Sequence, residues 1–181
     1  MGMKHCGKSS LGAMTADSYT LPFYDLDDFV LRHARAAGYP SVRELYRSAG
    51  REKFQEYERA AAQELAMFLD RYSLVAALGG GTVENEEAMK LLHERAALLY
   101  LDVEEDELFR RILESGIPPF LEGDRPPREL FAELFHRRSV LYRRWADAVL
   151  ELPAQSIEKN FARLIAFISE HTDFREVPHG G

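Results

Sequence analysis

Cysteine and long apolar stretches are scarce in this sequence, and their scarcity excludes several kinds of protein. Cys6 is the only cysteine among 181 residues, so no intrachain disulfide can form. This favours a reducing compartment, and we predict a cytoplasmic protein. No apolar run approaches the length of a membrane span. Basic residues are not in excess either, because the net charge of −7 argues against nucleic acid or an anionic membrane as the main partner.

The composition is otherwise that of a single globular domain. Hydrophobic residues make up 46% of the chain and charged residues 29%, and the length suits one domain. We predict that residues 1–172 form this domain. A lid is expected at about 116–127, where paired prolines and glycines disfavour regular structure. The polar tail, residues 173–181, is expected to be disordered, and the protein is expected to be a monomer.

Strands and helices are expected to alternate along the chain, the order that is typical of an α/β fold with helices layered on a sheet. Short apolar runs predict the strands, and apolar residues at helical spacing predict the helices. The expected strands cover about 21–25, 73–78 and 97–102, with a brief one near 149. The expected helices cover about 7–15, 29–37, 51–69, 85–94, 104–114 and 128–145, with a short one from 41 and a last one that carries residues 157–168.

The segment from Gly2 to Ser9 reads GMKHCGKS and matches the phosphate-binding motif GxxxxGK[ST] in full. Gly2 and Gly7 permit the tight loop in which successive backbone N–H groups point at phosphate oxygens. Lys8 brings a positive charge to the terminal phosphates, and the Ser9 hydroxyl is a hard oxygen ligand for Mg²⁺. The helix that begins here adds its positive end. We therefore predict that the chain binds ATP with Mg²⁺, the alternative being a chance match to four fixed positions.

A buried strand should precede such a loop, yet only Met1 stands before Gly2. In a fold of this kind that strand lies in the middle of a parallel sheet, and without it the neighbouring strands lose a hydrogen-bonding partner. We therefore expect the native polypeptide to begin several residues upstream. The additional segment should hold about five mostly apolar, β-prone residues after a short polar lead.

Acidic residues follow the first expected strand, in the sequence FYDLDD. Asp25 and Asp27 stand two apart, so strand alternation is expected to turn both carboxylates to the same side. One could help to hold hydrated Mg²⁺ while the other accepts a hydrogen bond from a substrate hydroxyl. Asp28 is expected to open the next helix as a cap or a first-turn acid. The alternative interpretation is a solvated acidic strand end.

Three consecutive glycines, Gly79, Gly80 and Gly81, follow the apolar run SLVAAL. Three glycines in a row cost chain entropy, and a plain turn does not need them. The cost is understandable where backbone must approach a ligand closely at the carboxyl end of a strand, the usual binding edge of an open α/β sheet. A flexible loop is the alternative interpretation.

These three signals in this order, GKS, then DLD, then GGG, resemble the shikimate kinase family. The likeness extends over most of the chain. Residues 38–58 are similar to the family's substrate-binding helical segment, 117–123 to its lid and 138–146 to its arginine-bearing helix. The resemblance implies a P-loop three-layer sandwich with a central parallel five-stranded sheet flanked by helices. It also implies transfer of the γ-phosphoryl group of ATP to the 3-hydroxyl of shikimate, with Mg²⁺.

The resemblance also implies a role for each matching residue. Catalysis would involve Lys8, Asp25 and Asp27, and the metal ion would be held by Ser9 and Asp25. The nucleotide site would comprise Gly2, Gly7, Lys8, Ser9, Ser10 and Arg111, the last of them near adenine. The acceptor site would comprise Asp27, Gln55, Gly79, Gly80, Gly81 and Arg138, the last of them on the acceptor carboxylate.

The position of Arg138 supports a role in binding independently of the resemblance. An arginine that is aimed inward is costly unless it meets an anion. The acceptor carboxylate is one such anion, and a structural ion pair would satisfy the guanidinium equally well. Position 138 lies on the apolar stripe of its helix, which comprises Phe131, Leu134, Phe135, Leu141, Tyr142 and Trp145.

Two arginines of the family have no counterpart in this chain. Gln55 stands where the family places an arginine on the substrate carboxylate, and Pro118 stands where the lid carries another. The loss of one charged hydrogen bond costs on the order of 1.5–3 kcal/mol. Arg125 and Arg128 could act from beyond the lid, unless they are solvated loop charges. We predict a shikimate kinase; the alternatives are a related kinase for another small hydroxylated metabolite and a relative that binds nucleotide without catalysing transfer.

Overall fold

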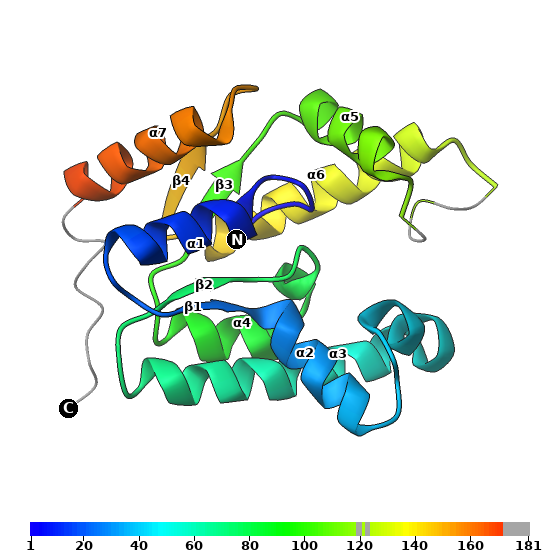
Figure 1. Cartoon of the computed structure of the whole chain (residues 1–181). Coiled ribbons are helices and arrows are strands. Elements are labelled where there is room, and N and C mark those ends of the chain that lie inside the picture. Colours follow the sequence, from blue (N-terminus) through cyan, green and yellow to red (C-terminus); the bar gives the residue numbers. More distant parts are fainter. Residues whose placement is uncertain (119–120, 122–123, 172–181) are drawn as a thin grey trace.

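The structure is a computed structural model that describes residues 1–118, 121 and 124–171. The expected helices and strands are present, with bounds that differ from the predictions by a few residues (Figure 1). No helix in these ranges has both the length and the apolar character that a membrane span requires. The elements are α1 (Lys8–Ser18), β1 (Phe23–Asp25), α2 (Leu26–Ala36), α3 (Val42–Leu69), β2 (Val75–Ala77), the 3₁₀ turn η1 (Thr82–Glu84), α4 (Glu86–His93), β3 (Leu99–Asp102), α5 (Glu105–Ser115), α6 (Pro127–Trp145), β4 (Ala148–Glu151) and α7 (Ile157–Glu170).

The two helices expected on either side of Gly50 form one kinked element, α3. Gly50 has a φ of 79°, which is outside the helical region and is accessible to glycine at little cost. Ser41 caps the first segment by accepting a hydrogen bond from the amide of Glu44 at 3.1 Å. The kink at Gly50 redirects the chain, so the residues that follow it face a different part of the molecule.

The strands pair in parallel, as the alternation of strands and helices predicts, but within the described ranges they form two separate sheets. One sheet joins β1 to β2, and the other joins β3 to β4. Met1 lies along β3: its amino group donates to the Leu99 carbonyl at 2.7 Å, and the Leu101 amide donates to the Met1 carbonyl at 2.9 Å. A cavity of about 560 Å³, lined mainly by apolar residues, lies between β2 and β3. The α/β class is confirmed, whereas a continuous five-stranded sheet and an upstream segment stay predictions.

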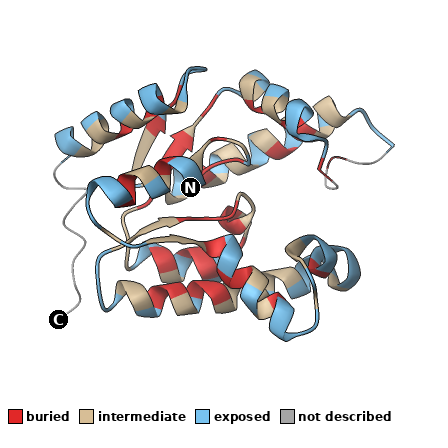
Figure 2. Cartoon of the chain, in the orientation of Figure 1, coloured by how far each residue is buried: buried red, intermediate tan, exposed pale blue. Residues whose placement is uncertain are grey.

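Helices cover the strands from both sides. Helix α1 contacts β1, β2 and α7, while α2, α3 and α4 pack together on the other side of β1 and β2 (Figure 1). Burial follows this arrangement, since the buried faces of α3 and α4 turn toward the strands (Figure 2). The largest fully buried side chains are Tyr100, Tyr142, Phe131, Met3, Leu11, Leu26, Leu45, Leu65, Met89, Leu92, Leu108 and Ile112.

Tyr142 of α6 connects the core to the loops at the carboxyl edge of the strands. Its ring is fully buried and stacks on that of Tyr100 in β3, with 4.9 Å between the ring centroids. Its hydroxyl donates to the Gly80 carbonyl at 2.6 Å. Burial raises the pKa of Tyr142, so the hydroxyl keeps its proton and remains a donor. One side chain thus holds α6, β3 and the glycine loop together.

Tyr142→Phe is expected to lower the free energy of unfolding by about 1–3 kcal/mol, because the Gly80 carbonyl would lose its buried partner. Urea unfolding followed by circular dichroism measures the change. Tyr39→Phe is the matched control, since the Tyr39 ring packs against Tyr57 and its hydroxyl has no hydrogen bond to the described residues. Equal stability of the two variants would show that the Tyr142 hydroxyl contributes nothing.

Candidate active site

The phosphate loop has the backbone shape that its motif predicts. His5 (φ 67°) and Gly7 (φ 91°) are left-handed, and alternation of such residues with right-handed ones turns successive N–H groups to one side. Gly7 is the N-cap of α1, and no side chain in the described part of the chain caps this end. A Cβ on Gly2 would stand 2.8 Å from both the Cys6 Sγ and the Leu101 carbonyl oxygen, so only glycine fits there. The free N–H groups of the first turn, including those of Ser9 and Ser10, therefore form an anion site.

Ser9 and Asp25 place two hard oxygen ligands side by side. The Ser9 hydroxyl donates to Asp25 Oδ2 at 2.6 Å, and Lys8 follows the loop with its Nζ 3.4 Å from the Met3 carbonyl. Among the residues that the structure describes, no group of three or more His, Cys, Asp or Glu side chains could enclose a metal ion. The pair fits Mg²⁺, which commonly takes one or two protein oxygens together with substrate phosphates and water.

Asp25 and Asp27 converge as expected, but the predicted reason is wrong. Strand β1 ends at Asp25, and Asp27 lies in the first turn of α2, so strand alternation does not relate the two residues. Asp25 is the N-cap of α2 and accepts the Asp27 amide at 3.1 Å. The expectation that Asp28 opens this helix as a cap or a first-turn acid is confirmed, because Asp28 is a first-turn acid.

Asp27 occupies an environment that disfavours its ionised form. Asp27 is exposed as a residue, but the protein atoms packed around its carboxylate desolvate it and raise its pKa above the ordinary value; the nearby carboxylate of Asp25 raises the pKa further, while Lys8 lowers it. A carboxylate with a raised pKa is a better proton acceptor than an exposed one. The side chain is thus suited to receive a proton from a hydroxyl placed against it.

At each glycine of the triple-glycine loop the backbone lies close to a different group, so a Cβ there would make a tight contact. A Cβ on Gly79 would stand 2.6 Å from Asp27 Oδ1, closer than real Cβ atoms come. A Cβ on Gly80 would stand 3.2 Å from the backbone nitrogen of Lys4 in the phosphate loop, and one on Gly81 would stand 3.3 Å from Arg138 Nη2. The close approach of backbone to functional groups, rather than flexibility, explains the run of glycines.

Arg138 meets an anion that belongs to the chain itself. Its Nε and Nη2 both donate to Glu84 Oε2, at 3.2 and 2.9 Å, and Arg137 Nε donates to Glu84 Oε1 at 2.8 Å. The exposed fractions of the Arg138 and Glu84 side chains are only 14% and 10%. Burial alone would raise the pKa of Glu84, but the two arginines lower it below the ordinary value. A structural ion pair, the alternative that the sequence leaves open, is therefore present in this state.

Four further residues that the sequence singles out, Arg111, Gln55, Arg125 and Arg128, make contacts of different kinds. Arg111 Nη1 donates to the His5 carbonyl at 2.9 Å, so it borders the phosphate loop. Gln55 Nε2 donates to the Glu84 carbonyl at 3.4 Å and lines the same pocket as Arg138. Arg125 and Arg128 form ion pairs with nearby glutamates and an aspartate. The predicted lid at 116–127 includes residues 119, 120, 122 and 123, and these four, like the predicted tail 173–181, lie outside the described residues.

The comparison with known proteins agrees with this geometry. The family model for shikimate kinase matches residues 4–169. The chain belongs to the shikimate kinase family. Members of this family are phosphotransferases with an alcohol acceptor, and they use ATP with Mg²⁺.

Individual relatives match over most of their length. Shikimate kinase of Chlamydia pneumoniae is 35% identical over 139 residues, which cover 75% of this chain and 77% of the relative. That of Burkholderia pseudomallei (strain 1710b) is 33% identical over 157 residues, covering 87% and 81%. The fold matches a shikimate kinase from Acinetobacter baumannii, solved in complex with shikimate, with a TM-score of 0.80, 22% identity and coverage of 93% and 90%. One from Bacteroides thetaiotaomicron matches with a TM-score of 0.78, 25% identity and coverage of 93% and 96%.

Glu58 is a buried acid at this site that sequence reasoning missed. Its exposed fraction is 2%, and it accepts hydrogen bonds from Thr82 Oγ1 at 2.7 Å and Asn85 Nδ2 at 3.1 Å. Burial raises its pKa, although these two bonds oppose the shift. Its position in the sequence could have indicated burial. Glu58 precedes the buried Ala61 and Leu65 by three and seven residues, so it lies on the same face of the helix as they do.

Asp27→Asn is expected to raise the thermal midpoint at pH 7. The pKa of Asp27 is raised in the folded protein, so its ionised form destabilises the fold at pH values above the folded pKa. That cost falls as the pH drops through the folded pKa and is absent below the unfolded pKa of about 3.9. The gain in midpoint should therefore be full at pH values above the folded pKa and shrink as the pH is lowered toward the unfolded pKa, in a series of thermal melts. A gain no larger than that of Asp17→Asn, which removes an exposed carboxylate from α1, would contradict the prediction.

Proposed function

We propose that this chain transfers the γ-phosphoryl group of ATP to the 3-hydroxyl of shikimate, releasing ADP and shikimate 3-phosphate. One observation carries the proposal: the three-residue loop Gly79–Gly81 approaches Asp27, the phosphate loop and Arg138 in turn. The phosphate loop is a donor site and the pocket beside Arg138 is an acceptor site. Because a single short loop borders both, the two substrates would meet at Asp27.

On the donor side, the phosphate loop would hold the nucleotide by its backbone. The N–H groups of Gly7, Lys8, Ser9 and Ser10 would bind phosphate oxygens, and the Lys8 ammonium would neutralise charge on the terminal phosphates. Arg111 would lie near adenine, at the border of the loop where it already binds the His5 carbonyl. Ser9 and Asp25 would hold Mg²⁺, which when bound neutralises charge that develops during transfer.

On the acceptor side, Asp27 would orient and then deprotonate the hydroxyl. The hydroxyl oxygen forms a bond to the γ-phosphorus, the bond from that phosphorus to the bridging oxygen of ADP breaks, and the proton passes to Asp27. The raised pKa of Asp27 makes this proton transfer less unfavourable. Arg138 and Gln55 would hold the rest of the acceptor from the pocket walls.

A related kinase for a different hydroxylated metabolite is the second candidate, and two residues favour it. Gln55 brings no charge to the pocket, and Glu84 already binds Arg138. Release of ADP should be compared across shikimate, quinate and gluconate with a coupled assay. Stimulation by shikimate above both others supports the first proposal, whereas equal rates with and without shikimate would refute it. Cytoplasmic localisation and a monomeric state remain predictions.

Lys8→Ala is expected to reduce phosphoryl transfer by about 10²–10³-fold, because transfer depends on preorganised charge at the phosphates. Initial rates of ADP formation at saturating shikimate measure the loss. Lys90→Ala is the matched control, since Lys90 lies on the exposed face of α4 and, among the described residues, forms an ion pair with Glu86 alone. A Lys8→Ala protein that keeps the wild-type thermal midpoint and near wild-type turnover would refute the role of the loop.

A further inference from the structure

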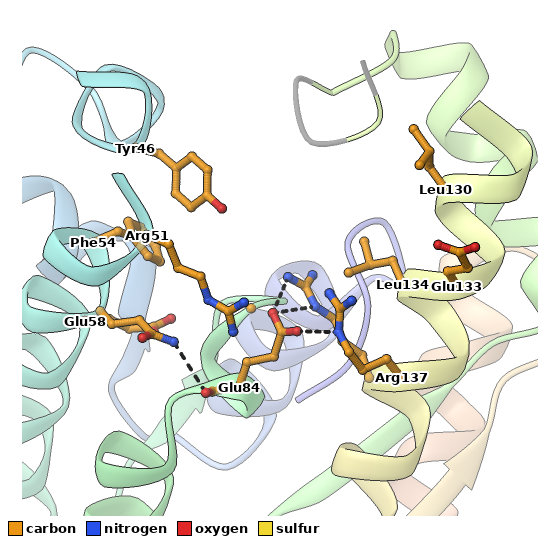
Figure 3. A pocket seen from close by; sticks show the side chains of 12 residues that line it. Tyr46, Arg51, Phe54, Glu58, Glu84, Leu130, Glu133, Leu134 and Arg137 are labelled. Atoms are coloured by element: carbon orange, nitrogen blue, oxygen red, sulfur yellow. Dashed lines mark hydrogen bonds and ion pairs between the residues drawn. The ribbon is translucent and has the colours of Figure 1, made fainter. Parts of the chain in front are cut away.

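The acceptor pocket is a small polar cavity between α3, η1 and α6 (Figure 3). Its volume is about 280 Å³, at the small end of the range for metabolite sites. Aromatic and apolar side chains, among them Tyr46, Phe54 and Leu134, form part of the wall. The remaining wall is charged, and the balance of those charges decides which acceptor the pocket accepts.

Most of the charged side chains in the wall already have an ion-pair partner among the described residues. Glu84 binds Arg137 and Arg138, while Glu133 pairs with Arg125 outside the cavity. The third acid of the lining, Glu58, is buried and accepts hydrogen bonds from Thr82 and Asn85 with its carboxylate. Burial raises the pKa of Glu58, and the hydrogen bonds from Thr82 and Asn85 oppose the shift.

Arg51 is the lining cation that remains without a partner. Within the described part of the chain it makes no ion pair and no hydrogen bond. Figure 3 shows its side chain extending from α3 toward Glu84, at the centre of the group of pocket side chains. The pocket therefore holds a guanidinium whose charge is not compensated by any described acid.

The backbone explains why Arg51 reaches the cavity. The kink at Gly50 begins the second segment of α3, and Arg51 is the first residue after it. Arg51, Phe54, Gln55 and Glu58 recur at i, i+3, i+4 and i+7, which places them on one helical stripe, and all four line the cavity. Arg51 thus lies one turn before the neutral Gln55, on the same face of α3, and both residues line the pocket.

We propose that Arg51 binds the carboxylate of the acceptor, together with the edge of Arg138 that Glu84 leaves open. This inference rests on the proposed function. Glu84 engages Nε and Nη2 of Arg138, whereas no hydrogen bond to a described residue involves Nη1, and Arg138 lines the pocket. Arg138 shares the single carboxylate of Glu84 with Arg137, and Arg51 adds a guanidinium that no described acid pairs with. Arg51 is therefore the specificity-determining residue of the pocket.

The test compares Arg51→Gln with the wild-type protein by steady-state kinetics. The KM for shikimate is expected to rise about ten- to hundred-fold, because one charged hydrogen-bonding pair is lost, while the KM for ATP stays within about two-fold. Arg47→Gln is the matched control: it removes the same charge from an exposed position four residues earlier on α3, outside the pocket lining, and should change neither constant.

A second arm tests whether the charge itself matters. The double variant Arg51→Gln with Gln55→Arg returns a guanidinium to the same stripe one turn later, and it should restore the KM for shikimate to within a few-fold of wild type. The methyl ester of shikimate lacks the anionic charge. The wild-type preference for acid over ester should fall about ten-fold in Arg51→Gln.

The outcomes separate this inference from the proposed function. If the wild-type protein does not phosphorylate shikimate, the proposed function fails. If it does, and Arg51→Gln keeps the wild-type KM for shikimate, the inference about Arg51 is wrong while the function stands. An equal loss for acid and ester would also overturn it, because Arg51 would then support the pocket without binding the carboxylate. Circular dichroism of each variant checks that the fold is retained.

Discussion

The close approach of the Gly79–Gly81 backbone to its neighbours is the constraint on which the whole site depends. A Cβ on Gly79 would stand 2.6 Å from Asp27 Oδ1 and force the two apart, while a Cβ on Gly80 or Gly81 would make tight contacts of 3.2 and 3.3 Å with the phosphate loop and with Arg138. The buried Tyr142 hydroxyl holds the same loop from the opposite side by its bond to the Gly80 carbonyl. The core of α6 and β3 thus fixes the position of the loop that separates the phosphate loop from the pocket beside Arg138.

Charge is arranged around this loop at some cost to stability. Glu58 is buried, and Asp27 lies beside Asp25 where neighbouring atoms desolvate its carboxylate, so the pKa of each is raised and its ionised form is less stable than in an unfolded chain. Glu84 and Arg138 are buried as a pair, which is tolerable only because Arg137 and the geometry of the guanidinium satisfy the carboxylate. Such an arrangement is typical of a site where ligand binding, rather than folding alone, has shaped the residues.

Local sequence signals predicted much of this. The phosphate motif, the acids after β1 and the run of glycines were identified because each reflects backbone chemistry within a few neighbouring residues. The helix and strand positions followed from apolar spacing for the same reason. Asp27 shows the limit: its location near Asp25 was predicted, but through strand alternation, whereas an N-cap at Asp25 starts a helix there. A local sequence pattern can thus identify which residues lie at a turn without predicting the backbone geometry of that turn.

The sequence by itself determined the fold class, the family and the nucleotide-binding loop, since these depend on residue order and on short spacings. Only the tertiary structure decided the partners of the charged residues. Glu84 and Arg138 are 54 positions apart, and Glu58 and Thr82 are 24 apart, so no spacing rule could join them. The orientation of Arg51 depends on the kink at Gly50 and on the packing of α3 against the rest of the chain. Ion pairing and burial depend on which residues are neighbours in three dimensions. The pocket beside Arg138, which α3, η1 and α6 line together, could therefore not be predicted from the sequence.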